Sequence, residues 1–512
     1  MVEDGCIVDV NPSTGALIAK VPCSTAAEVD RAVVAARTAQ PMWQECGLPQ
    51  RHELIAGALL KLKDRQGGLD GLAELISLEM GKVLREAKDE VAGAVDKDHF
   101  LKLVRAANED ELIDEATGTT MVRDPHGVVA VISPWNFPAD EILLLALPAL
   151  MAGNTVIVKP SEVTPLVGKA VVECLQETLP AGVLGLLQGD GEVGKLLVAH
   201  KGIDMIGFTG SCATGRSIMA AAAPDLKRIV LELGGKDPMV VFADADLELA
   251  ADQAVQWSLH NCGQVCCAVE RVYIEAAAKE AFEAKCLEKI KAWKAGDALD
   301  EDSRIGPLVS QRQKQLVAGH VADALVAGAR CLHGGVDEQL QGSNFFRATL
   351  LTDVPQTAKI TREETFGPVL ALTAFDGSED GAVHLCNDTD FGLTAAVFSA
   401  DTAKARRVST KIRAGQVGIN SCVCFAWCAV CLCAVRPPFS IDKKVTLVLR
   451  FTGGHQQLAL RERAGAGAVG RGTRLRLWVP LRCRWMAAVF RAEDPRRHQM
   501  KKKLILADQR RH

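Results

Sequence analysis

The sequence predicts an α/β protein built on doubly wound parallel sheets, and two observations lead to this prediction. From Gly127 onward, short apolar runs typical of buried strands alternate with longer segments of helical periodicity. The chain has 512 residues, of which 48% are hydrophobic and 24% are charged. That length is sufficient for two or three domains, and the composition is ordinary for a globular protein.

The first quarter of the chain is expected to be mainly helical. Residues 24–28 (Ser-Thr-Ala-Ala-Glu) form a capping box that opens an alanine-rich helix, and this helix is expected to end near Pro41. Helical periodicity continues in the segments 51–65 and 69–85. The stretch 108–124 is polar and alternates loosely, which predicts an exposed hairpin.

Strands and helices then alternate in two runs. The first run predicts strands at 128–132, 155–158, 185–187 and 205–209, with helices at 142–151, at 167–179 and directly after Ser211. The second run extends from Met239 to about Asn420, with helices at 282–293 and 311–327. Because a helix connects each pair of strands, the strands of each run are expected to be parallel.

The composition changes after Asn420. From Ser421 to the end the chain carries 19 Lys and Arg against 5 Asp and Glu, whereas the rest carries 40 against 58. No stable helical or strand period is visible in 421–512. We therefore expect a basic tail that is disordered and comes from a shifted reading frame or a retained intron. A divergent extension is the alternative.

Composition and charge also bear on the partners and the location expected of the protein. The net charge of −4 gives no sign of a nucleic-acid partner, and the apolar runs are shorter than a membrane span. The start of the chain is acidic and lacks the features of a leader, so its 17 cysteines are expected to be reduced thiols in the cytoplasm. The cysteines between 422 and 433 lie close together without histidine, so no metal site is expected there.

Two segments that follow predicted strands are candidates for holding a dinucleotide. In 159–162 (Lys-Pro-Ser-Glu), Lys159 can hydrogen-bond ribose hydroxyls, and Glu162 can accept a hydrogen bond from the adenosine 2′-OH. In 207–215, glycines and Ser211 at a strand–helix junction let backbone N–H groups approach a pyrophosphate. Taken alone, the first segment could be a solvated turn and the second could serve tight packing, since its spacing is not G-x-G-x-x-G.

Cys266 and Glu232 are the candidates for covalent chemistry. Cys266 follows a Gly-Gln turn at 263–264, and Glu232 precedes the glycine pair 234–235. A thiol nucleophile and a carboxylate that activates water are what the two-step oxidation of an aldehyde requires. One cysteine among 17 is more often a core thiol, and a Glu before two glycines can simply end a strand. The hypothesis therefore depends on both segments occurring together.

These segments, with 134–138 (Pro-Trp-Asn-Phe-Pro) and 363–368 (Glu-Glu-Thr-Phe-Gly-Pro), resemble signatures of the NAD(P)-dependent aldehyde dehydrogenase superfamily. The four signatures occur in the family's order, and the resemblance covers about 10–420. It implies a Rossmann-type nucleotide-binding domain, an α/β catalytic domain and an oligomerisation hairpin. The implied boundaries are 1–107 and 126–233 for NAD binding, 108–125 for the hairpin and 234–420 for catalysis.

The resemblance implies a role for each matching residue. Cys266 would be the nucleophile that forms a thiohemiacetal and then a thioester, and Glu232 would activate the hydrolytic water. The Asn136 amide, with the Cys266 backbone N–H, would form the oxyanion hole. The implied cofactor is NAD, with NADP as the second candidate, and the substrate is a small aldehyde that becomes a carboxylic acid. The implied cofactor-binding residues are Trp135, Lys159, Glu162, Gly210, Ser211, Glu364 and Phe366.

The chain departs from the family in three places. Residues 268–271 are Ala-Val-Glu-Arg, where many relatives have Ala-Gly-Ser-Arg. Glu141 and Leu144 stand where many relatives have apolar or aromatic pocket residues, and we expect Glu141 to be a solvated residue at a helix start. The alternative is a pocket carboxylate that favours a cationic aldehyde. After Asn420 the family's last helix and assembly strand are replaced, so the homodimer or tetramer that the family implies is expected to assemble badly.

Two other functions remain open at this stage. One is a catalytically impaired pseudo-enzyme or nucleotide-binding protein, because the end of the family's chain is lost. The other is a CoA-acylating semialdehyde dehydrogenase, which the presence of Glu232 disfavours because this residue would drive hydrolysis.

Overall fold

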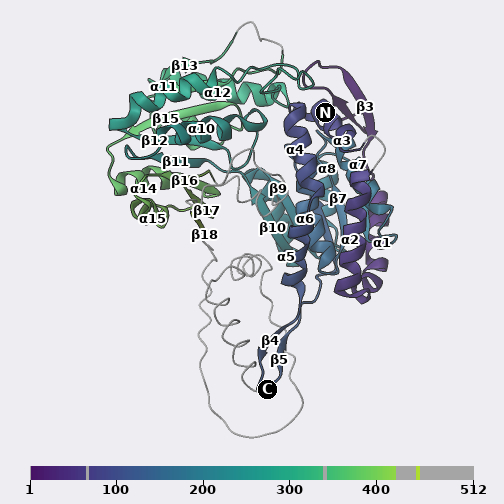
Figure 1. Ribbon diagram of the computed structural model, residues 1–512. Helices are drawn as coiled ribbons and strands as arrows, with labels where there is room; N and C mark the ends of the chain where they lie inside the picture. Colours follow the sequence, from purple (N-terminus) through teal and green to yellow (C-terminus); the bar gives the residue numbers. More distant parts are fainter. Residues whose placement is uncertain (1, 65–67, 338–342, 423–445, 450–512) are drawn as a thin grey trace.

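The computed structural model describes residues 2–64, 68–337, 343–422 and 446–449, and its arrangement is shown in Figure 1. Two sheets flanked by helices form the body of the protein. A small antiparallel sheet lies at the N-terminus, and a two-stranded hairpin projects from the body. Most of the predicted tail, 423–445 and 450–512, lies outside the described residues, as do four of the closely spaced cysteines (Cys424, Cys428, Cys431 and Cys433).

The first sheet is entirely parallel, as the alternating pattern predicts. Its strand order is β10-β9-β6-β7-β8, so the chain runs outward from β6 in one direction and then returns to continue on its other side. In such sheets a ligand site is expected beyond the carboxyl ends of the strands where the order reverses. The strands are β6 (Val128–Ile132), β7 (Thr155–Lys159), β8 (Leu184–Leu186), β9 (Met205–Gly210) and β10 (Arg228–Leu233).

Helices cover both faces of this sheet because its central strands are apolar on both sides. Val129 and Val131 of β6 pack toward one cluster of helices, whereas Val128 and Ala130 pack toward another. The helices of the first cluster are α2 (Gly47–Asp64), α3 (Gly68–Met80), α4 (Leu84–Val95), α5 (Asp98–Asn108), α6 (Asp140–Met151) and α7 (Pro165–Gln176). Those of the second are α8 (Gly191–Ala199), α9 (Cys212–Ala222) and most of α1 (Ala26–Glu45).

The start of α1 is as predicted, but its end is not. Thr25 and Glu28 form the capping box, with the Glu28 carboxylate 2.8 Å from the Thr25 backbone nitrogen. The expected end near Pro41 is wrong, because the helix continues through this proline to Glu45. Trp43, in this added turn, is fully buried, and its indole N–H donates to the Leu150 carbonyl at 2.9 Å. Burial of this large side chain outweighs the helix-breaking tendency of proline.

The helical segment expected at 69–85 is interrupted. It divides into α3 and α4 at Gly81, which has a φ of +84° and lies so close to Pro307 that a Cβ would be 2.6 Å from the proline ring. Only glycine fits such a position without strain. The sequence analysis placed no element between 86 and 107, where the structure has the rest of α4 and α5.

The second sheet has the strand order β13-β14-β15-β12-β11-β16-β17-β18, and only its two edge strands are antiparallel to their neighbours. Its strands are β11 (Asp237–Val241), β12 (Val269–Glu275), β13 (Arg330–His333), β14 (Thr349–Thr352), β15 (Val369–Phe375), β16 (Thr394–Phe398), β17 (Gln416–Ile419) and β18 (Thr446–Leu449).

Helices again lie on both faces of the second sheet. One face packs against α10 (Leu247–Leu259), α11 (Lys279–Ile290), α12 (Gln311–Val326) and the short α13 (Lys359–Arg362). The other packs against α14 (Glu379–Asn387) and α15 (Thr402–Ser409). The strand β18 lies in the stretch where the sequence analysis found no element, so that expectation is wrong at these four residues. β18 is antiparallel to β17.

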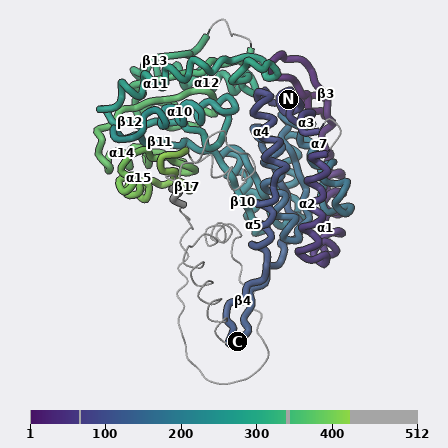
Figure 2. Tube along the Cα trace, in the orientation of Figure 1, coloured from purple at the N-terminus to yellow at the C-terminus, as the bar shows by residue number. Residues whose placement is uncertain are grey.

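The predicted hairpin is confirmed as a structure. β4 (Glu111–Asp114) and β5 (Thr119–Met121) pair antiparallel and extend away from the body, as the trace in Figure 2 shows. Leu112 and Ile113 are 55% and 50% exposed. The N-terminal sheet is formed by β1 (Val2–Glu3), β2 (Cys6–Val10) and β3 (Leu17–Pro22).

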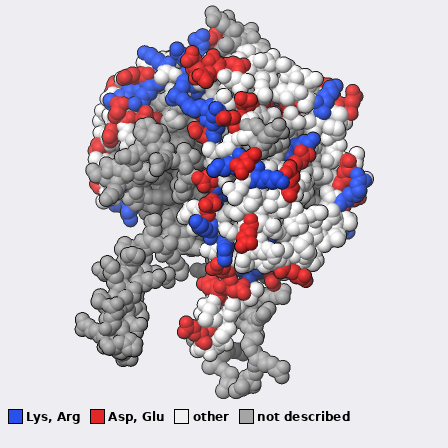
Figure 3. Space-filling model, turned by 45° about the vertical axis from the view of Figure 1, so that its right-hand side comes forward, with Lys and Arg blue, Asp and Glu red and all other residues white. Residues whose placement is uncertain are grey.

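Charges of both signs are interspersed over the molecular face in Figure 3. Within the described ranges, no helix is both long and apolar enough to cross a bilayer. The described side chains also bring together no group of three His, Cys, Asp or Glu that could hold a metal ion.

Two buried carboxyl groups join the N-terminal sheet to the body. Asp9 of β2 and Glu79 of α3 are each less than 3% exposed, and Glu79 accepts hydrogen bonds of 2.7 Å from the backbone nitrogens of Leu166 and Val167. Burial raises the pKa of Asp9 to about 6. Burial, with the nearby charge of Asp9, raises the pKa of Glu79 to about 9. At a pH between its ordinary pKa and its raised pKa, each of these carboxyl groups therefore keeps a proton that it would release in the unfolded chain.

We predict that Asp9→Asn raises the melting temperature at pH 8. A carboxyl whose folded pKa is raised costs stability once the pH exceeds its unfolded pKa, and for Asp9 the full cost is present above pH 6. The gain is expected to be on the order of 2 kcal/mol at pH 8 and to disappear near pH 4. Thermal scans from pH 4 to 8 measure it, with Glu3→Gln as an exposed control in the same sheet. A gain independent of pH would contradict this account.

Candidate active site

The residues predicted to carry out chemistry line one cavity to which both sheets contribute. Its volume is about 350 Å³. Its walls include Trp135 and Asn136 from the loop after β6, Thr209, Gly210 and Ser211 at the end of β9, Glu232 of β10, Cys266 and Cys267 before β12, and Glu364 and Phe366 before β15. Of the predicted site residues, Lys159 and Glu162 are not part of its lining.

The segment that carries Cys266 has an unusual backbone. Asn261 and Cys262, in the 3-10 helix His260–Gly263, have φ values of +52° and +57°, and Gly263 has a φ of +70°. A Cβ on Gly263 would lie 2.1 Å from the Gly367 carbonyl oxygen, so only glycine is accommodated. This close approach joins the cysteine segment to the segment that carries Glu364.

Gln264 and Asn136 fix the same turn from inside. The Gln264 side chain is fully buried, donates to the Asn261 carbonyl at 3.1 Å and accepts from the Val309 backbone nitrogen at 2.9 Å. The Asn136 amide donates to the Gln264 carbonyl at 3.1 Å. Two of the predicted signatures are thus in direct contact, which places the Asn136 amide beside the cysteine segment.

The glycine pair after Glu232 allows a second close approach. A Cβ on Gly234 would lie 2.2 Å from a carboxylate oxygen of Glu364, and one on Gly235 would lie 2.6 Å from the Cys266 carbonyl oxygen. The Gly235 backbone nitrogen also donates to Glu364 at 3.2 Å. The glycines are therefore required because the connection from β10 to β11 passes between the cysteine and Glu364.

The Cys266 thiol is protonated at rest. Its pKa is raised well above the ordinary value, first by a hydrogen bond with the Cys267 thiol, then by burial and by nearby charges that include Glu141. A cysteine in this state needs a base to remove its proton before it can act as a nucleophile. Glu232, on the wall of the same cavity, is a carboxylate that could serve.

Glu141 does not have the environment expected from the sequence. It is only 9% exposed, lines the cavity, and accepts a hydrogen bond of 3.1 Å from the Thr209 hydroxyl. Thr209 pairs in register with Glu232 on the neighbouring strand. Burial, followed by the charges of Asp140 and Glu232, raises the pKa of Glu141 to about 8. The expectation of a solvated residue is wrong, because α6 directs this position toward the carboxyl ends of the strands. Leu144 is part-buried and packs against the core beneath the first sheet.

The residues proposed for a dinucleotide lie along the carboxyl edge of the first sheet. The ammonium group of Lys159, at the end of β7, donates to the carbonyls of Pro160 and Gly189 at 2.7 Å each and lies 3.8 Å from Glu162. Ser211 caps α9, where its hydroxyl accepts from the Thr214 nitrogen at 3.2 Å. A helix of eleven residues thus begins beside Gly210, where the sheet order reverses.

Aromatic rings from both parts of the chain meet beside these groups. Trp135 and Phe366 are in edge contact, with ring centroids 5.4 Å apart and planes at 84°. Glu364, next to Phe366, has a pKa raised to about 8, mainly by burial and then by the charge of Glu270. Ser211, Glu364, Phe366 and Cys266 all line this cavity.

A buried lysine that was not among the predicted site residues supports Asn136. The ammonium group of Lys82 donates to the Asn136 carbonyl at 2.8 Å and pairs with Glu90 at 2.5 Å, and both side chains are inaccessible to solvent. Glu90 also accepts from the Ala139 nitrogen at 3.0 Å. No local signal identified Lys82, because its partners come from α4 and from the loop after β6.

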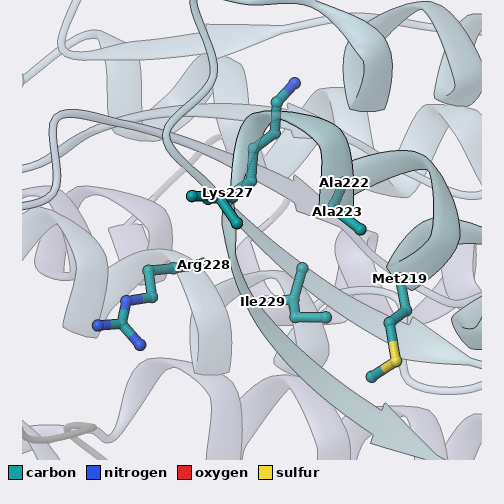
Figure 4. Close-up of a pocket in the computed structure, with 7 residues that line it drawn as sticks. Met219, Ala222, Ala223, Lys227, Arg228 and Ile229 are labelled. Atoms are coloured by element: carbon teal, nitrogen blue, oxygen red, sulfur yellow. The ribbon is translucent and has the colours of Figure 1, made fainter.

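A separate surface hollow lies near the opposite end of β10. It is shown in Figure 4, where Arg228 and Ile229 belong to the start of that strand and Met219 and Ala222 to α9. None of the predicted site residues lines it. Of these two hollows in the described part of the chain, only the one at the carboxyl end of β10 is lined by predicted site residues.

Comparisons with known proteins agree with this geometry. A sequence model described as the aldehyde dehydrogenase family matches residues 2–430, which extends beyond Asn420. An NADP-dependent enzyme of E. coli has 36% identity and a TM-score of 0.77, with 81% of this chain and 86% of that chain covered. Lactaldehyde dehydrogenase of E. coli has 35% identity and a TM-score of 0.78, with coverage of 82% and 88%. Betaine aldehyde dehydrogenase of Staphylococcus aureus, in complex with NAD⁺, has 34% identity and a TM-score of 0.75, with coverage of 81% and 83%.

We predict that Cys267→Ala makes Cys266 more reactive toward iodoacetamide. The hydrogen bond between the Cys266 and Cys267 thiols favours the protonated form of Cys266 and is the largest cause of its raised pKa, so its loss increases the thiolate fraction at fixed pH. A fall of one pKa unit would raise the rate about tenfold at pH 8. Peptide mass spectrometry follows alkylation of Cys266, with Cys212→Ala as a control that leaves the thiol pair intact. Equal rates in parent and Cys267→Ala would show that the pair does not control this thiol.

Proposed function

The chain belongs to the aldehyde dehydrogenase family, and from this premise we propose that it oxidises a small aldehyde to a carboxylic acid with NAD. The observation that supports this most directly is that Cys266, Glu232 and Asn136 line one cavity together with Glu364 and Phe366. The four segments come from distant parts of the sequence, and their convergence provides a nucleophile, a base, an oxyanion donor and a place for a cofactor.

The first chemical step is the addition of the Cys266 thiol to the aldehyde. Glu232 takes the thiol proton, the sulfur forms a bond to the carbonyl carbon, and the carbonyl oxygen becomes an oxyanion of the thiohemiacetal. The Asn136 amide and the Cys266 backbone N–H stabilise this oxygen, and loss of one such donor typically costs about 3–4 kcal/mol of transition-state stabilisation. Lys82, through the Asn136 carbonyl, holds the amide toward the cysteine segment.

The second step returns the cysteine to its resting state. When bound, NAD supplies the acceptor for the hydride that leaves the thiohemiacetal carbon, and Cys266 is then acylated as a thioester. After its first proton has passed to solvent, Glu232 removes a proton from a water molecule that attacks the thioester carbon. The carbon–sulfur bond then breaks, the thiolate takes that proton back from Glu232, and the carboxylic acid leaves. Because this carboxylate lies in the cavity, hydrolysis is favoured over transfer of the acyl group to CoA.

The dinucleotide is proposed to be held by seven residues from several segments: Trp135, Lys159, Glu162, Gly210, Ser211, Glu364 and Phe366. The adenosine ribose is assigned to Lys159 and Glu162, the pyrophosphate to the start of α9 and the nicotinamide end to Glu364 and Phe366. The Glu162 side chain is 40% exposed, so its carboxylate is accessible to a ribose hydroxyl and would repel a 2′-phosphate. We therefore propose NAD as the preferred cofactor and NADP as the weaker one.

The domain boundaries, the assembly and the location of the protein are proposed on the same premise. Residues 1–107 and 126–233 would bind the cofactor, 234–420 would carry the catalytic cysteine, and the projecting hairpin at 108–125 would serve assembly into a homo-oligomer. The exposed Leu112 and Ile113 support a contact surface on β4. Cytoplasmic location is proposed from the sequence.

We predict that the purified protein forms NADH when an aldehyde is added and that Cys266→Ala abolishes this activity while NAD binding is retained. The thiol makes the covalent bond, whereas other residues hold the cofactor. Absorbance at the NADH band measures turnover, and calorimetry measures binding. Replacing NAD by NADP in the same assay should lower kcat/KM. Full turnover by Cys266→Ala, or no turnover by the parent with any small aldehyde, would refute the proposed function.

We predict that Glu232→Gln slows release of the acid more than it slows the first hydride transfer, because solvent can take the thiol proton in its place whereas the hydrolytic water depends on the carboxylate. Without the base, the thioester accumulates, and a burst of one NADH per site should precede a slow steady state. Rapid mixing with excess aldehyde measures both phases. Glu283→Gln, on α11, is a matched control away from the cavity. A steady-state rate equal to that of the parent would remove Glu232 from the mechanism.

A further inference from the structure

A buried carboxylate links the cysteine segment to the segment that carries Glu364 and Phe366. It belongs to Glu270, four residues after Cys266 at the start of β12, and it is 5% exposed. We propose that Glu270 is a positioning residue that fixes the nicotinamide-binding segment relative to the catalytic cysteine. This inference rests on the proposed function and adds a residue to it, at a position where many relatives have serine.

Glu270 binds the backbone of the segment that it positions. One carboxylate oxygen accepts from the Phe366 nitrogen at 2.9 Å, and the other accepts from the Thr365 nitrogen at 2.9 Å. Hydrogen bonds of a charged acceptor to backbone N–H groups are stronger than those between neutral groups. The two residues between Glu364 and Gly367 are thus held by a single side chain.

A buried lysine completes the arrangement. The ammonium group of Lys236 is fully buried, pairs with the Glu270 carboxylate and donates to the Thr365 hydroxyl at 3.0 Å. His320 contacts the same hydroxyl through its Nδ1 at 3.1 Å, and its Nε2 lies 3.5 Å from Glu363. Glu270 therefore both holds the backbone and balances a cation that would otherwise be buried alone, which is costly.

The held segment has a conformation that it would not adopt alone. Phe366 has a φ of +52°, in the left-handed region that bulky residues rarely occupy. Its nitrogen donates to Glu270, its carbonyl accepts from the Gln313 amide at 3.0 Å, and its ring contacts Trp135. Strained backbone of this kind persists only where the surroundings hold it from several sides. Glu270 supplies the charged part of that support.

The consequence for the reaction is geometric. Cys266 lies three residues before the first residue of β12, and Glu270 is the second residue of that strand. The position of the nucleophile and that of the cofactor segment are therefore both fixed relative to β12. Loss of the Glu270 charge frees the Phe366 and Thr365 nitrogens and leaves Lys236 without its partner. The nicotinamide end should then be less well placed for hydride transfer, whereas the distant adenosine end should be unaffected.

The test compares Glu270→Gln and Glu270→Asp with the parent, using Glu275→Gln at the other end of β12 as a matched control. Calorimetry measures the binding of NAD and of ADP-ribose, which lacks the nicotinamide. We expect Glu270→Gln to weaken NAD about tenfold and ADP-ribose less than twofold. Glu270→Asp, which keeps the charge, should recover part of the loss, and Glu275→Gln should behave as the parent.

A kinetic readout separates positioning from a general effect on folding. With an aldehyde deuterated at its carbonyl carbon, Glu270→Gln should slow hydride transfer about tenfold and raise the isotope effect on kcat, while alkylation of Cys266 keeps the parent rate. Unchanged NAD binding with an unchanged isotope effect would overturn the proposal, and so would equal losses of NAD and ADP-ribose binding. If the parent oxidises no aldehyde, the proposed function fails, and the two binding measurements still decide the role of Glu270.

Discussion

The site depends on close approach between backbone segments that come from distant parts of the chain. At Gly263, Gly234 and Gly235, an added Cβ would lie 2.1 to 2.6 Å from atoms of the facing segments. At Gly263 and Gly235 the facing atoms include backbone oxygens, so a side chain would displace the facing backbone, and at Gly234 it would displace the Glu364 carboxylate. Because the backbone of the cysteine segment touches both the β10–β11 connection and the Glu364 segment, the nucleophile and the cofactor residues are brought around one cavity.

Charge burial imposes a second constraint on the same region. Lys82 with Glu90 and Lys236 with Glu270 are buried ion pairs, and each also binds the backbone of a segment in the site. Desolvation of such pairs costs about as much as their attraction returns, so they are better understood as devices for orientation than as sources of stability. The pKa of Cys266 is raised first by its hydrogen bond with Cys267 and then by burial, which makes a neighbouring base necessary.

Sequence patterns predicted β6 and β7 because these are short apolar runs buried on both faces. β10, an edge strand that is only part-buried, was not predicted as a strand. Prediction failed where packing overrode local preference. The proline within α1 did not end the helix, since Trp43 beyond it fills the core. Glu141 was expected in solvent, but the direction of α6 buries it beside Thr209. The later part of α4 was missed because Glu86 and Glu90 face inward, which obscures its amphipathic period. The buried side of α5 is apolar, with Phe100, Leu101 and Val104, so the same reason does not apply to it.

The sequence by itself determined the candidate nucleophile, the candidate base and the glycines around them, because these depend on residue type and spacing along the chain. It also determined the family to which the chain belongs. Only the tertiary structure decided which carboxyl groups share the cavity, which lysine neutralises Glu270 and why the Cys266 thiol keeps its proton. The reason is that pKa values and buried pairings depend on dielectric surroundings and on neighbours contributed by segments more than a hundred residues apart, such as Glu141 and Cys266.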